Sequence, residues 1–440
     1  MSQLAFPAAL VLILSLLSGC ASSVRPLMPT PTLYHTTPTK VLFEDLPPDR
    51  RRPRIELLYV TDREPEENSE TGLPYGEERA RSLAFGTAVV DMAPTLDWRE
   101  LERQSQLAER STEVNLEMGR IEELGRFPLE PYAMERTPSG VKRAKRVVAN
   151  HERTKAEFRA ELQRHLARSQ KGEVMLYVHG FNETFATAAY TAAELCHFFG
   201  REHACAFFTW PSSASGGFLT SYTSTTESAE YAVGHLIKTI RLIARTPGVT
   251  GVQLLAHSRG TAVLLSALRE LVIQTIAAGH EPAHVLKIDN LVLMSPDIDA
   301  DVARQKIEIF SSDPDLIARW NKERLPRVIN GRLTLYTSPS DRALLASTIL
   351  FRSRKRVGRL RPEDVPPEAR DYFSKWGNID LIVYEGKATD RFGHSYFSTN
   401  PEVSADLVQL IRYGRAPGDP ERPLVPMGAA TWKFPEQSTR

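Results

Sequence analysis

Short runs of apolar, often β-branched residues recur along the chain, and glycine, proline or aspartate bounds several of them. Runs of this kind are typical of buried β-strands. We expect eight strands, at Ile55–Thr61, Leu83–Val90, Val174–His179, Ala204–Trp210, Val252–His257, Asn290–Ser295, Leu333–Ser338 and Ile379–Glu385. Helical spacing of apolar positions follows the later strands, at Ala186–Phe199, Glu227–Arg245, Gly260–Ala278 and Ser398–Arg412. This alternation predicts an α/β fold, with a mostly parallel sheet covered by helices on both faces.

Three segments depart from the alternation. Residues 98–170 are charged and rich in Glu, Arg and Leu, which predicts a helical insertion between the second and third strands. Its apolar positions are spaced loosely, as on one side of surface helices, and suit either a lid or a structural cover. Residues 21–53 carry repeated prolines with many Ser and Thr, which predicts an extended tether. Residues 415–440 form a proline-rich tail, so we expect the folded domain over residues 54–414.

The composition is that of an ordinary globular protein. It excludes a small disulfide-stabilised protein, a collagen-like fibre and a wholly disordered chain. Of the 440 residues, 42% are hydrophobic and 25% are charged, which is enough to build a core without disulfide staples. The formal net charge is +1, so no overall field favours nucleic acid. The sequence has no phosphate-binding glycine loop, no HExxH and no paired CxxC. We therefore expect no metal and no organic cofactor.

The pattern at the N-terminus predicts an export signal. The apolar run from Leu4 to Leu17 is too short for a typical membrane span, and Leu17-Ser18-Gly19-Cys20 follows it. This ending resembles the lipobox of bacterial lipoproteins, in which the cysteine is acylated and becomes the mature N-terminus. The resemblance implies a signal peptide over residues 1–20, palmitate-type lipidation of Cys20 and, since Ala21 follows, the outer membrane of a Gram-negative cell. An uncleaved anchor or a chance cysteine is the alternative.

Two further cysteines, Cys196 and Cys205, lie close together in the sequence. An exported, oxidising setting permits a disulfide between them, whereas two buried free thiols are the alternative. The geometry that decides between these two states is not visible in the sequence.

The sharpest chemical pattern is Ala256-His257-Ser258-Arg259-Gly260, at the junction of an expected buried strand and an expected helix. This pattern, small-x-Ser-x-Gly between a strand and a helix, is typical of the nucleophile elbow of serine hydrolases. The serine sits on a tight, strained turn, and larger residues at 256 and 260 would collide with it. Ser258 is therefore the expected nucleophile, although a helix N-cap serine is the structural alternative.

An oxyanion hole is expected from two backbone N–H groups, those of Phe181 and Arg259. Phe181 belongs to Tyr177-Val178-His179-Gly180-Phe181-Asn182, where Gly180 allows the chain to turn sharply after a strand. Arg259 directly follows the nucleophile. For the imidazole of His179 we favour a structural role that holds this loop.

Ser258 needs a general base, and His394 is the best placed of the 11 histidines. It lies in a loop between the last expected strand and the last expected helix. Asp341 follows the seventh strand, so the order Ser258, Asp341, His394 matches the Ser, acid, His order of α/β-hydrolases. Asp297 and Asp299, after the sixth strand, are the alternative acids.

Six ordered blocks resemble one known family. They are Leu58–Arg63, Tyr177–Asn182, Phe208–Ser212, Ala256–Gly260, Ser295–Asp299 and Tyr336–Asp341, and Gly393-His394-Ser395-Tyr396 fits as well. They are similar to the bacterial α/β-hydrolases catalogued as domain of unknown function 900, over roughly Arg54 to Arg412 outside the insertion. The resemblance implies the α/β-hydrolase fold and a serine hydrolase of esterase or lipase type. Arg259 departs from the more frequent Met at that position.

The expected function is a lipid-anchored carboxylic ester hydrolase of the cell envelope, acting on an acyl-ester or lipid-like substrate without nucleic acid. The candidates for the substrate pocket are Asn182, Trp210, Phe392 and Tyr396, of which Trp210 equally suits a core aromatic. A peptidase, thioesterase or acyltransferase uses the same triad. A non-catalytic envelope module that keeps the fold for binding is the alternative from another class.

Overall fold

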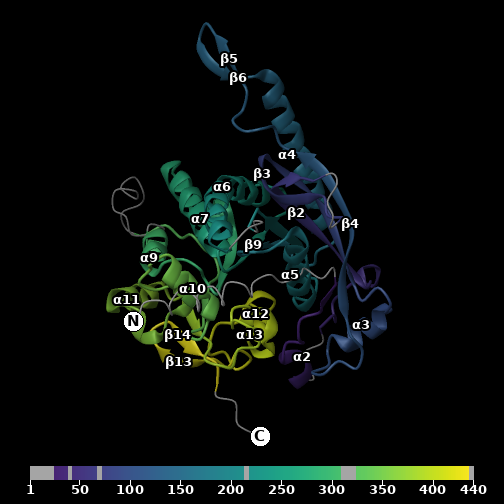
Figure 1. Cartoon of the computed structure of the whole chain (residues 1–440), viewed down its shortest axis with the longest axis vertical. Coiled ribbons are helices and arrows are strands. Elements are labelled where there is room, and N and C mark those ends of the chain that lie inside the picture. Colours follow the sequence, from purple (N-terminus) through teal and green to yellow (C-terminus); the bar gives the residue numbers. More distant parts are fainter. Residues whose placement is uncertain (1–23, 38–41, 67–71, 213–217, 309–323, 436–440) are drawn as a thin grey trace, which may run out of the picture.

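The computed structural model describes residues 24–37, 42–66, 72–212, 218–308 and 324–435 (Figure 1). In these residues one mixed sheet of twelve strands runs through the molecule. Its spatial order is β1 (Val24–Pro26), β4 (Asn115–Arg126), β3 (Tyr75–Met92), β2 (Arg54–Pro65), β8 (Ala204–Thr209), β7 (Glu173–Val178), β9 (Gly251–His257), β10 (Ile288–Met294), β11 (Leu333–Thr337), β12 (Ile379–Val383), β14 (Thr431–Lys433) and β13 (Val425–Gly428).

The α/β fold is confirmed, with parallel pairing from β2 through β8, β7, β9, β10, β11 and β12 to β14. Each of the eight expected strands forms. The expected sheet was too small, however, because β1 and β4 extend it at one end and β14 and β13 at the other.

Helices cover both faces of this sheet (Figure 1). α5 (Phe185–Phe198) and α13 (Pro401–Ile411) pack on one face, and α4 (Lys145–Leu166), α6 (Phe218–Ala244) and α7 (Gly260–Ala277) pack on the other. The remaining helices are short: α2 (Leu33–Thr36), α3 (Trp98–Gln104), α8 (Pro282–Leu286), α9 (Ala300–Glu308), α10 (Arg342–Leu350), α11 (Pro367–Trp376) and α12 (Tyr396–Thr399).

Each face of the sheet has its own apolar core, and successive residues of β2 alternate between them. Leu58 and Val60 pack in the core beneath α6 and α7, whereas Leu57 and Tyr59 pack in the core beneath α5 and α13. Side chains of a strand point alternately to its two faces, so a strand covered on both sides is apolar throughout. This explains why the continuous apolar runs of the sequence were sound indicators of strands.

The proline-rich segment before the domain is not an extended free tether where the structure describes it. Residues 24–37, here called the N-terminal strap, form β1 and α2 and bury several apolar side chains, among them Leu27, Met28, Leu33 and Tyr34. Arg25 pairs with the buried Glu194 of α5 at 2.7 Å. The prolines stand among apolar residues that pack on the domain, and composition alone did not reveal this.

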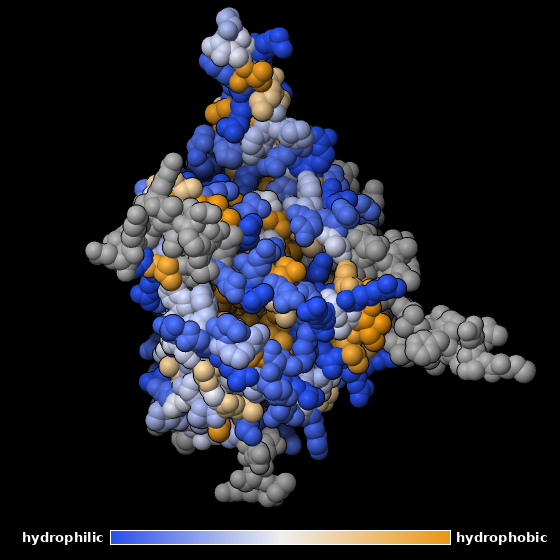
Figure 2. All heavy atoms as spheres, turned by 90° about the vertical axis from the view of Figure 1, so that its left-hand side faces the viewer, coloured by the Kyte–Doolittle hydropathy of each residue, from blue (hydrophilic) through white to orange (hydrophobic). Residues whose placement is uncertain are grey.

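The tail and the insertion also differ from expectation. Residues 425–433 add β13 and β14 to the sheet, and the fully buried Arg422 pairs with Asp406 at 2.7 Å. The insertion is helical only in part, because it supplies β4 and a separate hairpin of β5 (Met134–Thr137) and β6 (Gly140–Arg143). Together with the start of α4, this hairpin projects from the body of the molecule (Figure 1), and apolar side chains stand out among its polar ones (Figure 2).

Cys196, near the end of α5, and Cys205, in β8, form a disulfide with their Cα atoms 6.1 Å apart. The alternative of two free thiols is thereby removed. The bond ties α5 to the sheet within the core on that face.

Among the described residues, one helix is long and apolar enough to cross a membrane, namely α7. Most of its residues are buried within the molecule, as expected for a core helix that packs on the sheet beside α6. Residues 1–23, which include Cys20 and the expected signal peptide, lie outside the described residues.

Candidate active site

The order of strands places a topological switch point at β7 and β9. From β7 the chain crosses to β8 on one side, whereas from β9 it crosses to β10 on the other. At such a switch point the loops separate, and parallel α/β sheets bind their ligands outside the carboxyl ends of these strands. Gly180 follows β7 and Ser258 follows β9, so the two expected catalytic loops lie at this point.

Ser258 adopts the strained backbone conformation that a nucleophile elbow requires, with φ of +52°. Left-handed φ values are uncommon for residues other than glycine and often mark functional sites. The glycines around it allow close approach of the two loops. A Cβ on Gly260 would lie 2.2 Å from the His179 carbonyl oxygen, and one on Gly180 would lie 2.7 Å from Ser258 Cβ. The β9 turn therefore fits only against a backbone without side chains at these positions.

His394 and Asp341 form a close pair next to this elbow. The Nδ1 of His394 lies 2.7 Å from the Oδ2 of Asp341. The other carboxylate oxygen, Oδ1, accepts the backbone N–H of Leu344 at 2.9 Å and caps α10. Asp341 is fully buried, so its position is fixed by the fold. A carboxylate on Nδ1 favours the tautomer that leaves the Nε2 lone pair of His394 available as a base.

The surroundings of His394 raise the pKa of its imidazole ring. Burial lowers its pKa, but the charge of Asp341 and the hydrogen bond with it raise it, and the result lies above the ordinary 6.5. Asp390 holds the loop around the histidine, because its carboxylate accepts the backbone N–H groups of Phe392, His394 and Ser395 at 2.8, 3.3 and 2.8 Å.

In the described part of the chain, no hydrogen bond joins Ser258 Oγ to the His394 ring. Such contacts are often long in hydrolases without substrate and tighten during reaction. The two loops are nevertheless adjacent: the ring of His257, the residue before Ser258, lies 4.7 Å from that of His394. Burial and the charge of His394 hold the pKa of His257 well below 6.5, so His257 stays neutral beside it.

The two alternative acids are engaged elsewhere. Asp297 accepts a hydrogen bond from Ser347 Oγ at 2.6 Å and lies 3.3 Å from Arg356 Nε. Asp299 accepts the backbone N–H of Asp301 at 3.0 Å at the start of α9. The carboxylate on the His394 ring is that of Asp341.

His179 has a structural role in the loop after β7. Its Nδ1 lies 2.9 Å from the Gly180 carbonyl oxygen, and its Nε2 accepts the backbone N–H of Trp210 at 3.1 Å. Burial and the charge of Arg63 lower its pKa to about 3, so the ring is neutral. Asn182, with φ of +57°, turns the exposed end of the loop, and its N–H donates to the Ser212 carbonyl at 2.9 Å.

Arg63 is the site residue that the sequence did not single out. It is buried beneath this loop, where its Nε donates to Thr209 Oγ1 at 2.9 Å and a terminal nitrogen donates to the Glu183 carbonyl at 2.6 Å. Arg63 therefore ties Glu183, which follows the expected oxyanion donor Phe181, to the end of β8. The only sequence signal for this role was its place in the block Leu58–Arg63.

Two of the expected pocket residues are corrected. Trp210 and Tyr396 are both 0% exposed and cannot meet an incoming substrate. The Trp210 ring stacks on His179, with an angle of 3° between the ring planes, and Tyr396 stacks on Tyr384. Asn182 is exposed and Phe392 is half-buried, so these two remain available to a ligand.

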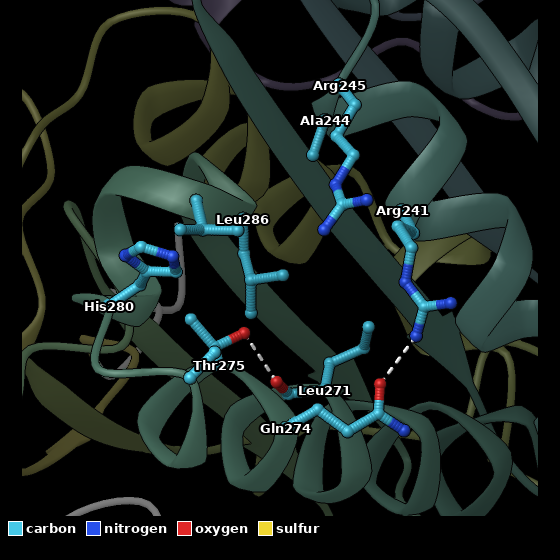
Figure 3. A pocket seen from close by; sticks show the side chains of 10 residues that line it. Arg241, Ala244, Arg245, Leu271, Gln274, Thr275, His280 and Leu286 are labelled. Atoms are coloured by element: carbon cyan, nitrogen blue, oxygen red, sulfur yellow. Dashed lines mark hydrogen bonds between the residues drawn. The ribbon is translucent and has the colours of Figure 1, made fainter.

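Two other features lie outside this site. A hollow of about 250 Å³ lies between the last turns of α6 and α7 and α8, lined by residues such as Arg241, Arg245, Leu271 and His280 (Figure 3). It is at the opposite end of α7 from Gly260. Glu56, Glu161 and His165 could hold a metal ion by their spacing. Arg164 already pairs with both glutamates at 2.6 Å, so their charges are compensated.

Comparison with protein families assigns the chain to a known family. The profile of a family described as "Alpha/beta hydrolase of unknown function (DUF900)" matches residues 154–413, more than half of the chain. Among solved structures, a crystal structure of acyl-protein thioesterase 2 from Zea mays is similar, with 15% sequence identity and a TM-score of 0.23. The match covers 47% of this chain and 93% of the thioesterase. Curated protein sequences give no match.

Proposed function

Because the chain belongs to the α/β-hydrolase family of unknown function DUF900, we propose that it is a serine hydrolase that cleaves carboxylic esters with Ser258, His394 and Asp341. The observation that carries the proposal is the 2.7 Å contact of His394 Nδ1 with Asp341, beside a serine at a strained turn. A histidine held in this way has one free basic nitrogen, which is what an otherwise weakly nucleophilic serine hydroxyl requires.

In the proposed reaction, Ser258 Oγ attacks the ester carbonyl carbon while His394 Nε2 takes the hydroxyl proton. The tetrahedral intermediate collapses, the bond to the leaving oxygen breaks, and His394 returns the proton to that oxygen. Water then attacks the acyl-enzyme, with His394 again accepting a proton, and releases the acid and free Ser258. Asp341 stays ionised and stabilises the positive ring that forms in each half of the reaction.

The negative oxygen of the intermediate needs donors, and the backbone N–H groups of Arg259 and Phe181 are proposed for this role. Arg259 stands at the first turn of α7, where helix N–H groups point outward and the helix dipole favours negative charge. A donor of this kind contributes about 3 kcal/mol to transition-state stabilisation.

We further propose that the enzyme is anchored in the cell envelope, in the outer membrane, by a lipid on Cys20. The motif Leu17-Ser18-Gly19-Cys20 supports this proposal. So does the disulfide of Cys196 and Cys205, because such bonds form and persist in oxidising compartments.

A fluorophosphonate probe, which reacts with activated serines, tests the proposed function directly. Wild-type protein should be labelled at Ser258, and Ser258→Ala should lose the label. Ser266→Ala is the matched control, since Ser266 lies in α7, the helix that follows Ser258, and should not affect labelling. Equal labelling of wild type and Ser258→Ala, or none in a folded wild type, would reject the proposal.

A further inference from the structure

Two arginines flank one aromatic ring beside the proposed nucleophile. The guanidinium carbon of Arg259, the residue after Ser258, lies 5.4 Å from the ring centre of Phe351. That of Arg356 lies 4.6 Å from the same ring centre. Phe351 ends α10, the helix that Asp341 caps at its start. This cationic cluster therefore adjoins the proposed catalytic residues on two sides.

The hydrogen-bonding capacity of this cluster is only partly used. Arg356 is 3% exposed, yet its Nε and one terminal nitrogen are buried without a hydrogen-bond partner. Its Nε lies 3.3 Å from Asp297 Oδ1, which is an ion-pair distance without hydrogen-bond alignment. Arg259 also has a buried Nε without a partner, and no carboxylate of the described residues forms an ion pair with it. Buried donors without acceptors are unfavourable, so an oxyanion here would satisfy them.

Exposed apolar side chains lie along the same helix. Leu345 is 44% exposed, Ile349 is 63% exposed and Phe351 is 38% exposed. Residues four apart share one face of a helix, so Leu345 and Ile349 form a short apolar strip on α10. Phe351 is the C-cap of the same helix and lies off this strip, beside the two arginines. Apolar side chains also show among polar ones on the side of the molecule that carries α9 and α11 (Figure 2).

We infer that Arg259 and Arg356 form a subsite for an anionic group of an amphiphilic ligand, whose apolar part contacts the exposed Phe351 at the end of α10. Carboxylates and phosphates are the groups that the planar guanidinium fork binds best. The inference rests on the proposed function. If the protein is an ester hydrolase, this subsite makes negatively charged acyl esters its preferred substrate class. Arg259 is then a determinant of substrate specificity.

Binding of small amphiphiles tests the subsite without turnover. Isothermal titration calorimetry of the wild-type protein compares hexanoate and hexyl phosphate with neutral hexanamide, which share the same chain length. We expect at least one anion to bind about tenfold more tightly than hexanamide, and to lose most of this advantage in Arg259→Met. Arg354→Met is the matched control, because Arg354 is an exposed arginine of the same segment and should leave the advantage unchanged.

The two anions distinguish a carboxylate subsite from a phosphate subsite. Arg259→Lys keeps the charge but loses the fork, so it should retain part of the advantage. If Arg259→Met does not fold, a fall of the wild-type advantage with rising salt supports the same conclusion. No preference of the wild type for either anion, or an equal preference in folded Arg259→Met, would overturn the inference. Labelling of Ser258 by the fluorophosphonate with no anion preference would overturn this inference alone and leave the proposed function intact.

Discussion

The Asp341 carboxylate meets the His394 ring at 2.7 Å although 53 residues separate the two in the chain. The same carboxylate caps α10 through the N–H of Leu344. One side chain thus begins a helix and orients the proposed base, so the folding of α10 and the alignment of His394 depend on a common contact.

The pH dependence of ester hydrolysis should report this contact. His394 acts as a base only when neutral, and its pKa is raised above 6.5. As pH rises, kcat/KM should therefore increase to a plateau, and the midpoint of this increase should lie above pH 6.5. Asp341→Asn removes the charge that raises the pKa and leaves the burial that lowers it, so the midpoint should move to lower pH. The plateau rate should fall on the order of 10⁴-fold. Asp299→Asn is the control, and an unshifted midpoint in Asp341→Asn would contradict the pairing.

Gly180 should be needed for activity because its missing side chain admits Ser258. A Cβ there would lie 2.7 Å from Ser258 Cβ, so Gly180→Ala must displace the loop that carries the Phe181 N–H. We expect kcat to fall about 100-fold or more while the protein remains folded. Gly234→Ala is the matched control, because nothing lies within 4 Å of its added Cβ in α6. Similar rates for the two variants would show that the loop tolerates the shift.

The N-terminal strap should stabilise the domain through Arg25 and Glu194. Arg25→Met leaves the Glu194 carboxylate buried without its cation. The free energy of unfolding should fall by about 2 kcal/mol, less than for a fully buried pair, because Arg25 is partly exposed. The double variant Arg25→Met/Glu194→Gln should recover most of the loss, because the amide is uncharged and its oxygen can still accept the Met28 N–H. Urea titration measures both, and Lys375→Met, which breaks an exposed pair, should have little effect.

Lipidation has a direct test in a bacterial host. Labelled palmitate should be incorporated into the wild-type protein and not into Cys20→Ser, which should also leave the membrane fraction. Cys196 and Cys205 form a disulfide and provide no free thiol for a competing acyl group. Label retained in Cys20→Ser would show that the lipobox resemblance is misleading.

The strands of the α/β core were predictable because both of their faces are buried. β9 and β10, for example, are almost continuously buried and mainly apolar, and the residues after strands supplied Ser258, Asp341 and His394 as candidates. The family expected from six sequence blocks is confirmed. The catalytic roles of the three residues remain predictions, although the structure does bring Asp341 and His394 together.

The outer parts of the sheet were missed for physical reasons. β4, with its many charged residues, is only partly buried, so it lacks the apolar alternation of a core strand and is composed largely of good helix formers. Arg25 reaches Glu194 and Arg422 reaches Asp406 only after folding, and such contacts leave no periodic pattern in the sequence. The prolines of both terminal segments favoured the prediction of linkers. The residues next to these prolines nevertheless pack against the domain.

Incorporation of the strap into the sheet limits how far the domain can stand from its proposed anchor. β1 begins at Val24, so only Ala21, Ser22 and Ser23 separate it from Cys20. Three residues span about 10 Å when fully extended. A lipid on Cys20 would therefore keep the edge of the sheet at the headgroup layer and restrict the enzyme to two-dimensional diffusion. Its substrates would then be molecules of the same leaflet or ones that come to it, and the rate of encounter would depend on their surface density.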